Sequence, residues 1–225
     1  MNPSNEYVCW LDIMGTKSSM SESFEKSANF IIRFHTAVLK AAVSKSVRVY
    51  PVMDGVYIVV EYLEDMREAI DKVMTCLAEL LLSETNNHRF IARGALAKGT
   101  IQHGRKISSE VSPDMAPRSG YKQHLLFGMP MIQAFNSEKQ APPFGIYIHE
   151  SARTVGGLQG RYYYWRRDDT LSDNEKLHES LRKELISFFK WEKERSYYLE
   201  LEKTKFEEYE DRVVEYFKMI QEGMH

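Results

Sequence analysis

The sequence contains few features of a secreted or membrane protein. It has only two cysteines, Cys9 and Cys76, and both lie in apolar segments. A disulfide framework is therefore not indicated, and a reduced, buried pair is typical of a cytosolic protein. No apolar run reaches the length of a membrane span, and the opening MNPSNEYV does not resemble a signal peptide. We expect a soluble cytoplasmic protein.

The sequence also lacks an excess of charge of one sign. Its 30 basic and 32 acidic residues give a net charge of -2, and its pI is about 6.4. Proteins that attract nucleic acid or anionic lipid through charge carry a clear basic excess, so we expect neither partner. Of the 225 residues, 43% are hydrophobic, which suits one domain with a sizeable core.

Apolar periodicity predicts helices interleaved with a largely antiparallel sheet, which is an α+β arrangement. Strands are expected at residues 7–13, 47–53, 56–62, 90–97, 144–151 and 160–166. Helices are expected at residues 21–43, 65–82 and 130–139. Residues 104–123 carry Gly, Ser, Pro and many charges, and a loop of this length is often functional.

The composition changes near residue 170. Two stretches with helical spacing follow, one with a stripe from Leu177 to Phe188 and one with a stripe from Phe206 to Ile220. We predict a domain over residues 1-170 and a helical extension over residues 171-225. The extension would pack on the core or on a second subunit.

Two aspartates each stand at the end of an apolar run. Asp12 ends the first strand, and Asp54 begins the hairpin signal Asp54-Gly55 between the next two strands. In a ferredoxin-like sheet these strands lie side by side, so the two carboxylates converge and repel unless a cation lies between them. Mg²⁺ prefers such oxygen ligands, and two metals at two aspartates suit phosphoryl transfer. The alternative is a turn former at Asp54 and a strand-end cap at Asp12.

The segment IMGTK follows Asp12 and suggests a phosphate site. Gly15 breaks the strand, and a turn of this kind exposes backbone N–H groups that suit a triphosphate. Lys17, after Thr16, would add a positive charge. The alternative is an ordinary turn with a surface lysine.

Four motifs in order give the chain, from about Tyr7 to Trp165, a resemblance to the class III nucleotidyl cyclase homology domain. LDIMGTK is similar to the opening motif of that family, and Asp54 in YPVMDGVYIVV falls on its second metal aspartate. ARGALAKG matches the next strand through Arg93, and FGMPMIQAFNSEKQA matches a late helix that begins with Gly and ends with Glu138.

The resemblance implies that a ribose 3′-hydroxyl attacks the α-phosphate of a nucleoside triphosphate and pyrophosphate leaves. Asp12, Asp54 and the backbone carbonyl of Ile13 would hold two Mg²⁺ or Mn²⁺ ions per site. Arg93 would meet the phosphates. The family's sites form at a head-to-tail dimer interface, which implies a homodimer whose second subunit completes each pocket.

The late helix departs from the family pattern. The resemblance aligns the family's catalytic Asn and Arg with Ile132 and Asn136, so Asn136 is the only polar residue of the pair. Another residue would then have to stabilise the negative charge of the transition state, or catalysis would be weak or lost. The substitutes, which the sequence does not rank, are Arg118, Lys122, Arg161, Arg166 and Arg167.

The positions that read the purine base in the family are also changed. They fall on Tyr50 and Leu125. In the family the first of these positions is Lys for adenine or Glu for guanine, and neither residue is present here. A tyrosine shrinks the pocket and suits a pyrimidine. The chain therefore resembles the stand-alone pyrimidine cyclases of the bacterial Pycsar anti-phage system, which implies UTP or CTP as substrate, with UTP preferred, and a separate effector that senses cyclic UMP.

Three alternatives remain open on the sequence. One is a purine cyclase with an unusual pocket, and another is a degenerate, non-catalytic domain that binds a nucleotide as a sensor. A palm-type polymerase also uses two aspartates, but the chain lacks the basic surface that grips a template. The trigger, the effector and the role of residues 104–123 are not evident from the sequence.

Overall fold

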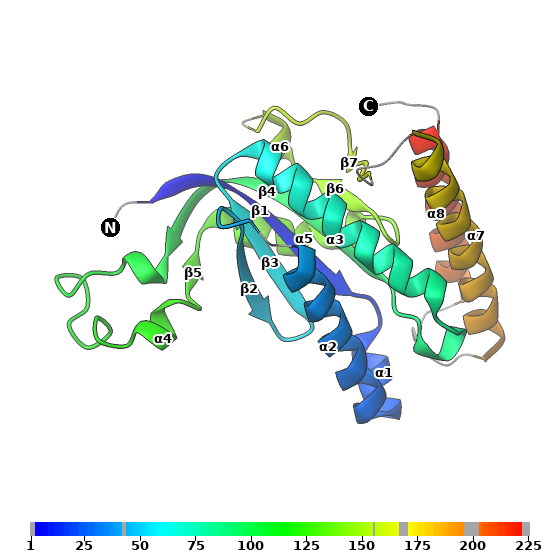
Figure 1. Ribbon diagram of the computed structural model, residues 1–225, viewed down its shortest axis with the longest axis horizontal. Helices are drawn as coiled ribbons and strands as arrows, with labels where there is room; N and C mark the ends of the chain where they lie inside the picture. The colour runs from blue at the N-terminus through cyan, green and yellow to red at the C-terminus, as the bar shows by residue number, and fades with distance from the viewer. Residues whose placement is uncertain (1–2, 42–43, 155, 167–170, 196–202, 222–225) are drawn as a thin grey trace.

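The computed structural model describes residues 3–41, 44–154, 156–166, 171–195 and 203–221 (Figure 1). Its centre is a mixed, largely antiparallel sheet in the order β2-β3-β1-β4-β6-β7, and a short β5 pairs with β4. Among the strand pairs of the described residues, β4–β6 alone is parallel. The strands are β1 (Ser4–Ile13), β2 (Arg48–Val52), β3 (Gly55–Val60), β4 (Ala92–His103), β5 (Leu126–Phe127), β6 (Ile146–Ile148) and β7 (Tyr162–Tyr163).

Helices cover both faces of the sheet, so the predicted α+β fold with a helical C-terminal part is confirmed (Figure 1). α2 and α3 lie on one face, and α5 lies on the other, against β1 and β4. The helices are α1 (Thr16–Glu22), α2 (Phe24–Ala41), α3 (Leu63–Ser83), α4 (Ser119–Lys122), α5 (Met129–Ser137), α6 (Glu150–Thr154), α7 (Leu171–Arg195) and α8 (Lys203–Gln221).

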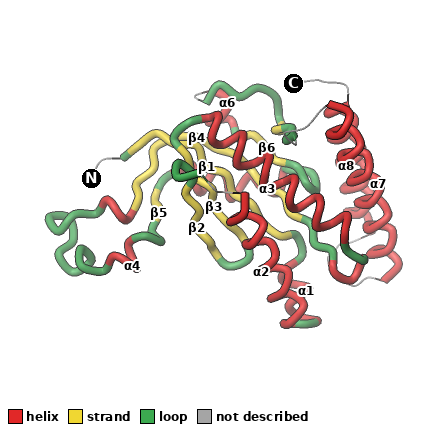
Figure 2. The backbone as a smooth tube through the Cα atoms, viewed as in Figure 1, coloured by secondary structure: helices red, strands yellow, loops and turns green. Residues whose placement is uncertain are grey.

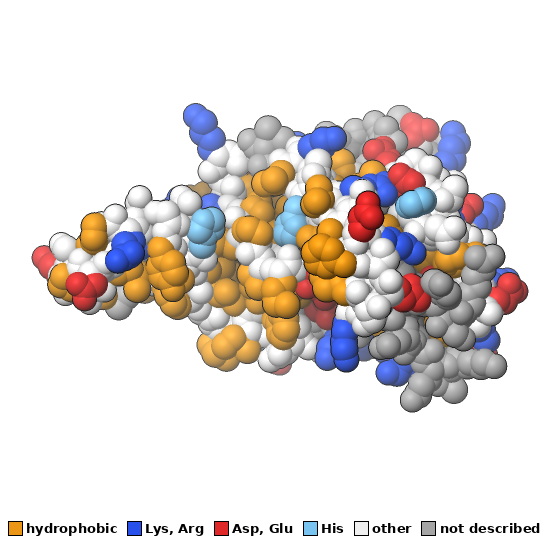
Figure 3. All heavy atoms as spheres, turned by 90° about the horizontal axis from the view of Figure 1, so that it is seen from below, with side chains coloured by type: hydrophobic (Ala, Val, Ile, Leu, Met, Phe, Trp, Pro, Cys, Tyr) orange, Lys and Arg blue, Asp and Glu red, His pale blue; other side chains and the backbone are white. Residues whose placement is uncertain are grey.

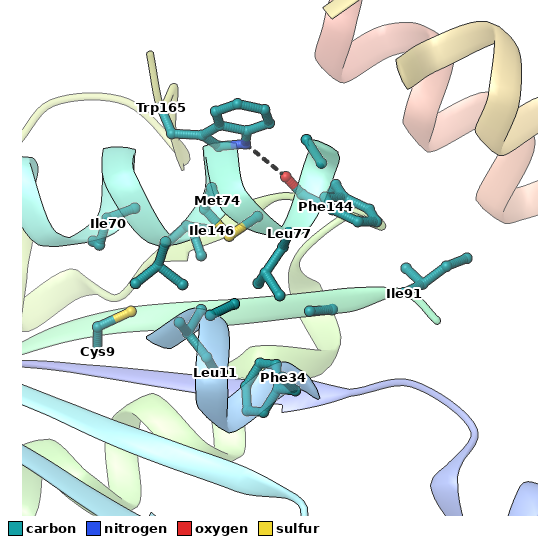
Figure 4. Packing of buried hydrophobic residues seen from close by; sticks show 14 of the residues in the cluster. Cys9, Leu11, Phe34, Ile70, Met74, Leu77, Ile91, Phe144, Ile146 and Trp165 are labelled. Atoms are coloured by element: carbon teal, nitrogen blue, oxygen red, sulfur yellow. Dashed lines mark hydrogen bonds between the residues drawn. The ribbon is translucent and has the colours of Figure 1, made fainter. Parts of the chain in front are cut away.

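The main core lies between the sheet and α2 and α3 (Figure 4). Alternate residues of β1 point into it, since side chains of a strand alternate between faces; Cys9 and Leu11 are fully buried there. Trp165 closes one side and donates an indole hydrogen bond of 2.8 Å to the carbonyl of Phe144. Cys9 and Cys76 are both free; Cys9 is buried as expected, whereas Cys76 is only half-buried.

The β2–β3 hairpin differs by one residue from the prediction. Val52 pairs with Gly55, so Met53 and Asp54 form the turn and Gly55 is the first residue of β3. A side chain at Gly55 would overlap the indole ring of Trp10, which crosses directly over it. The glycine is therefore required for close packing on Trp10, and the prediction of Asp54-Gly55 as the turn was wrong.

The C-terminal helices pack on the rest of the same chain. α7 and α8 lie side by side at one end of the molecule, and α7 contacts α3 (Figure 2). Leu181 and Phe217 are fully buried, and His178 contacts the ring of Trp165 at a centroid distance of 4.6 Å. Residues 167–170, where the proposed domains 1-170 and 171-225 meet, lie outside the described residues, so this boundary stays a prediction.

Residues 104–127 form an arm that extends from the opposite end of the molecule (Figure 2). The backbone N–H of Gly104 donates to the carbonyl of Leu125 at 2.9 Å, and Lys122 donates to the carbonyl of Ile107 at 3.1 Å. The segment predicted as a loop therefore has its own internal hydrogen bonds. Across the part of the chain that the structure describes, every helix is too short or too polar to cross a bilayer.

Candidate active site

Asp12 lies near the end of β1, on the face of the sheet that α5 covers. Val8 and Trp10, two and four residues earlier, point to the same face. Burial of the Asp12 carboxyl and, to a lesser degree, the charges of Asp54 and Glu138 together raise its pKa to about 7, against the opposing effect of Arg93. A carboxyl group held among other acids in this way favours a proton or a cation.

The second aspartate reaches Asp12 through strand pairing. Val56 of β3 pairs with Leu11 of β1, which brings the β2–β3 turn beside the end of β1. The structure therefore brings together Asp12 and Asp54, as the sequence predicted. Asp54 lies in the turn that follows β2, the strand that carries Tyr50, so Tyr50 and Asp54 do not share a strand.

The donor set at this corner fits a divalent cation. Two close carboxylates, one of them mostly buried with a raised pKa, are relieved by positive charge between them. No group of three or more His, Cys, Asp or Glu side chains arranged for a metal occurs among the described residues. The predicted set differs from such a group, because it combines two carboxylates with the backbone carbonyl of Ile13.

The turn after Asp12 is fixed by local hydrogen bonds. The Thr16 hydroxyl donates to the carbonyl of Ile13 at 3.1 Å, and the N–H of Met14 donates to the carbonyl of Ile91 at 2.8 Å. Gly15 has a φ of 77°, in the left-handed region that glycine tolerates best. α1 begins directly after it, and Lys17 is exposed there.

Arg93 lies opposite Asp12 in the β1–β4 register, but its charge is already paired. Its Nε donates to a carboxylate oxygen of Glu138, in an ion pair in which both side chains are at most 10% exposed. Its Nη1 donates to the hydroxyl of Tyr209, on α8, at 3.2 Å. The sequence analysis missed both partners. In this chain Arg93 is directed to Glu138 and Tyr209, so contact with a phosphate remains a prediction.

Tyr50 lies on the same face of the sheet as Asp12 and is 6% exposed. Its hydroxyl lies 2.6 Å from Nδ1 of His103, and Nε2 of His103 lies 2.9 Å from Glu6. The sequence analysis missed His103 and Glu6. Strand alternation gives the signal for them, because Glu6 shares a face with Asp12 on β1, and His103 shares one with Arg93 on β4.

A hollow of about 390 Å³ adjoins Tyr50, between β2 and the arm. Its walls combine two cations with polar side chains, and the charge of Arg105 acts on the Tyr50 hydroxyl. The hollow is lined by Arg48, Val49, Tyr50, Arg105, Ser119 and Gln123. The predicted base-reading tyrosine thus forms part of a pocket wall.

Other predicted site residues are exposed or half-buried in the single chain. Ile132 and Asn136 are exposed on α5, while Ala134 faces the sheet. Leu125 is half-buried at the base of the arm, where its carbonyl accepts the hydrogen bond from Gly104.

The candidate substitute cations belong to other elements of the fold. Arg118 and Lys122 belong to the arm. The guanidinium of Arg161 lies over the ring of Tyr162, and the N–H of Arg166 donates to Asp71 on the α3 side of the sheet. Arg167 lies outside the described residues.

No protein-family model matches the sequence, and no curated protein matches it either. Solved structures do match. A bacterial light-regulated adenylyl cyclase superposes with a TM-score of 0.55 at 12% sequence identity, over 82% of this chain and 59% of that one. The fold is that of class III nucleotidyl cyclases.

Two further structures agree with this fold. Adenylyl cyclase CyaB from P. aeruginosa matches with a TM-score of 0.51 and 14% identity, over 75% of this chain and 98% of that one. Another structure of a bacterial light-regulated adenylyl cyclase matches with a TM-score of 0.54 and 13% identity. This chain spans 59% of each light-regulated cyclase chain. At these identities the likeness establishes the class III fold alone.

Proposed function

We propose that this protein is a nucleotidyl cyclase that converts a pyrimidine nucleoside triphosphate, preferably UTP, to its 3′,5′-cyclic monophosphate, cyclic UMP, and pyrophosphate. The observation that carries this proposal is the pair Asp12 and Asp54, which meet at one corner of a class III cyclase sheet with a strongly raised pKa at Asp12. A structural carboxylate has no need of a second acid beside it, whereas a metal site does.

Different residues would bind the metals and the phosphates. Asp12, Asp54 and the Ile13 carbonyl would hold two Mg²⁺ or Mn²⁺ ions, and bound metals would stabilise the attacking 3′-oxygen and the leaving pyrophosphate. The backbone N–H groups after Gly15, together with Lys17, would bind the phosphates. Arg93 is close enough to Asp12 to act on its charge and would contribute to phosphate binding if Glu138 released it.

We infer that Tyr50 limits the base to a pyrimidine. Its ring is buried in the pocket wall on the metal-site face, where it reduces the space for a second base ring. Leu125 offers no hydrogen bond to a purine edge. The positions that read a purine in the related family are therefore apolar or bulky here.

The active form would be a homodimer with head-to-tail sites. Figure 3 shows hydrophobic side chains gathered over the middle of one face, beside the arm. Large exposed apolar residues include Met53 at the metal-site turn, and Met129, Ile132 and Phe135 on α5. A second copy would cover such residues and place its Asn136 at the first copy's aspartates.

The biological role would be that of a second-messenger generator in anti-phage defence. The resemblance to stand-alone pyrimidine cyclases supports it, because those enzymes release a cyclic pyrimidine nucleotide that a separate effector senses. The protein would act in the cytoplasm without contact with nucleic acid.

Three observations favour alternatives. The three solved structures named above are adenylyl cyclases, which favours ATP as substrate. The ion pair of Arg93 with Glu138, and Ile132 in place of a polar residue, favour a non-catalytic nucleotide sensor.

One experiment separates these readings. The protein is incubated with each of the four ribonucleoside triphosphates and Mn²⁺, and the products are resolved by mass, with Asp54→Ala as the inactive control. Cyclic UMP as the main product is expected. Cyclic AMP or cyclic GMP as the main product would indicate a purine cyclase, and nucleotide binding without any cyclic product would indicate a sensor.

A further inference from the structure

A buried chain of hydrogen bonds runs behind Tyr50. Its hydroxyl lies 2.6 Å from Nδ1 of His103, and Nε2 of His103 lies 2.9 Å from one carboxylate oxygen of Glu6. Ser4 donates to that same oxygen, and Arg48 donates to the other. His103 is fully buried and Glu6 is 2% exposed, so the partners decide where each proton lies.

Glu6 is ionised at neutral pH. Burial raises its pKa, but hydrogen bonds from His103, Ser4 and Arg48 outweigh burial and lower the pKa to about 2. An ionised carboxylate can only accept hydrogen bonds. The hydrogen between Glu6 and His103 therefore belongs to Nε2 of His103.

Nδ1 of His103 is consequently bare in the neutral imidazole. Glu6 already forms an ion pair with Arg48, so its charge is balanced without a proton on Nδ1 of His103. A bare Nδ1 only accepts, so Tyr50 donates its single proton to His103, and the Tyr50 oxygen keeps only acceptor capacity.

We propose that His103 and Glu6 are positioning residues that make the Tyr50 oxygen a hydrogen-bond acceptor toward the base and thereby select uracil through its N3–H. This inference rests on the proposed function and names the base specificity of the same site. Cytosine presents a bare N3 at that position, so two acceptors would face each other and neither would be paired. An unpaired polar group in a closed pocket weakens binding markedly.

The isosteric variant Glu6→Gln tests which atoms donate and which accept in these hydrogen bonds. Arg48 has only donors, so it holds the oxygen of the new amide, and the amide N–H₂ group faces Nε2 of His103. Nε2 must then accept, the imidazole proton moves to Nδ1, and Nδ1–H donates to Tyr50. The Tyr50 hydroxyl is released to donate to the base, which suits the bare N3 of cytosine.

We expect the ratio of kcat/KM for UTP to that for CTP to fall by at least about tenfold in Glu6→Gln. In a Tyr50→Phe background the same substitution should leave the ratio unchanged. Without the hydroxyl, the exchange of donor and acceptor at His103 cannot reach the base. Glu64→Gln, at an exposed ion pair with Arg67 on α3, is the matched control and should keep the wild-type ratio. His103→Leu, which also frees the Tyr50 proton, replaces Glu6→Gln if that variant does not fold.

Heteronuclear NMR of isotope-labelled histidine gives a readout that needs no turnover. A protonated Nε2 and a bare Nδ1 are expected for His103 in the wild type and the reverse in Glu6→Gln, with His103→Gln to assign the signal. The opposite tautomer in the wild type, or an unchanged UTP-to-CTP ratio in a folded variant, overturns the inference.

The proposed function fails separately. If no triphosphate is cyclised, the preference for UTP over CTP is measured from their dissociation constants. A fall of this preference in Glu6→Gln then supports the inference, although the proposed cyclase activity is disproved. Absence of binding by both pyrimidine triphosphates overturns the two proposals together.

Discussion

The hydroxyl of Tyr209, on α8, accepts a 3.2 Å hydrogen bond from Nη1 of Arg93, on β4, and the two residues are 116 positions apart in the sequence. The guanidinium also lies 5.8 Å from the centre of the Tyr209 ring. Arg93 stands opposite Asp12 in the sheet and pairs with Glu138. The C-terminal helices therefore reach the corner where the two aspartates meet.

Removal of the Tyr209 hydroxyl should impair catalysis more than folding. Tyr209→Phe keeps the ring over Arg93 but loses one hydrogen bond to a charged group, a change of roughly 1.5–3 kcal/mol. We expect a several-fold or greater fall in kcat, measured with UTP and Mn²⁺, and a change of a few degrees at most in Tm. Tyr62→Phe, at an exposed tyrosine, is the control. Equal rates for Tyr209→Phe and wild type would show that this contact serves stability alone.

Loss of either aspartate should abolish cyclisation and preserve the fold. Asp54→Ala removes a charge that raises the pKa of Asp12, so the metal-free protein should be at least as stable as wild type. Turnover is expected to fall below a few per cent in Asp12→Ala and Asp54→Ala, and to vanish in wild type after chelation of divalent ions. Substantial turnover by Asp54→Ala would disprove the metal assignment.

The stability of the metal-free protein should depend on pH through Asp12. Its pKa is about 7 in the folded chain against an ordinary value of 3.8, so the folded state binds the extra proton between these limits. The free energy of unfolding should therefore fall as pH rises from about 4 to about 7, by a few kcal/mol at most. Denaturant titrations of wild type and Asp12→Asn at several pH values isolate this contribution, because only the wild type should show it. Saturating Mg²⁺ should remove the difference at high pH, since the metal replaces the proton.

Strand patterning predicted the aspartate corner but not its detail. Adjacent strands required Asp12 and Asp54 to meet, and they do. The Asp-Gly signal placed the turn one residue late, because nothing local reveals that Gly55 must pass beneath Trp10. β4 continues to His103, beyond the predicted end at residue 97, because residues 98–101 pair with the start of β1, a long-range pairing that the local pattern does not show.

The long-range partners were beyond the reach of the sequence. In the sequence, Tyr209 is one member of the apolar stripe of a predicted helix. Only the packing of α8 places its hydroxyl beside Arg93. His103 shares a face of β4 with Arg93, but only the tertiary packing reveals that its Nδ1 lies 2.6 Å from the hydroxyl of Tyr50. Pairings of this kind depend on tertiary geometry and not on local pattern.

Subunits with complementary defects should restore activity if the sites lie between two copies. Asp12→Ala removes the metal corner, and Asn136→Ala removes the exposed polar group of α5 that a partner would supply. Each variant alone should be inactive or nearly so, and a mixture should recover up to one working site per heterodimer. Sedimentation at the assay concentration provides the control, and a monomer with full turnover would contradict the shared site.

The base pocket should lose its selectivity when Tyr50 is truncated, and the ring and the hydroxyl should contribute separately. A purine would have to share space with the phenol ring, and overpacking of this kind costs about 1–3 kcal/mol. Tyr50→Ala should therefore lower turnover of UTP and narrow the difference in rate between UTP and the purines ATP and GTP, in assays in which each triphosphate is offered alone.

Tyr50→Phe keeps the ring and should still reject purines, while it loses the hydrogen bond to His103. Faster cyclisation of ATP or GTP than of both pyrimidine triphosphates by the wild type would contradict this pocket, as would unchanged rates and ranking in Tyr50→Ala. Purine rejection lost in both variants would assign selectivity to the hydroxyl, because only the hydroxyl is absent from both.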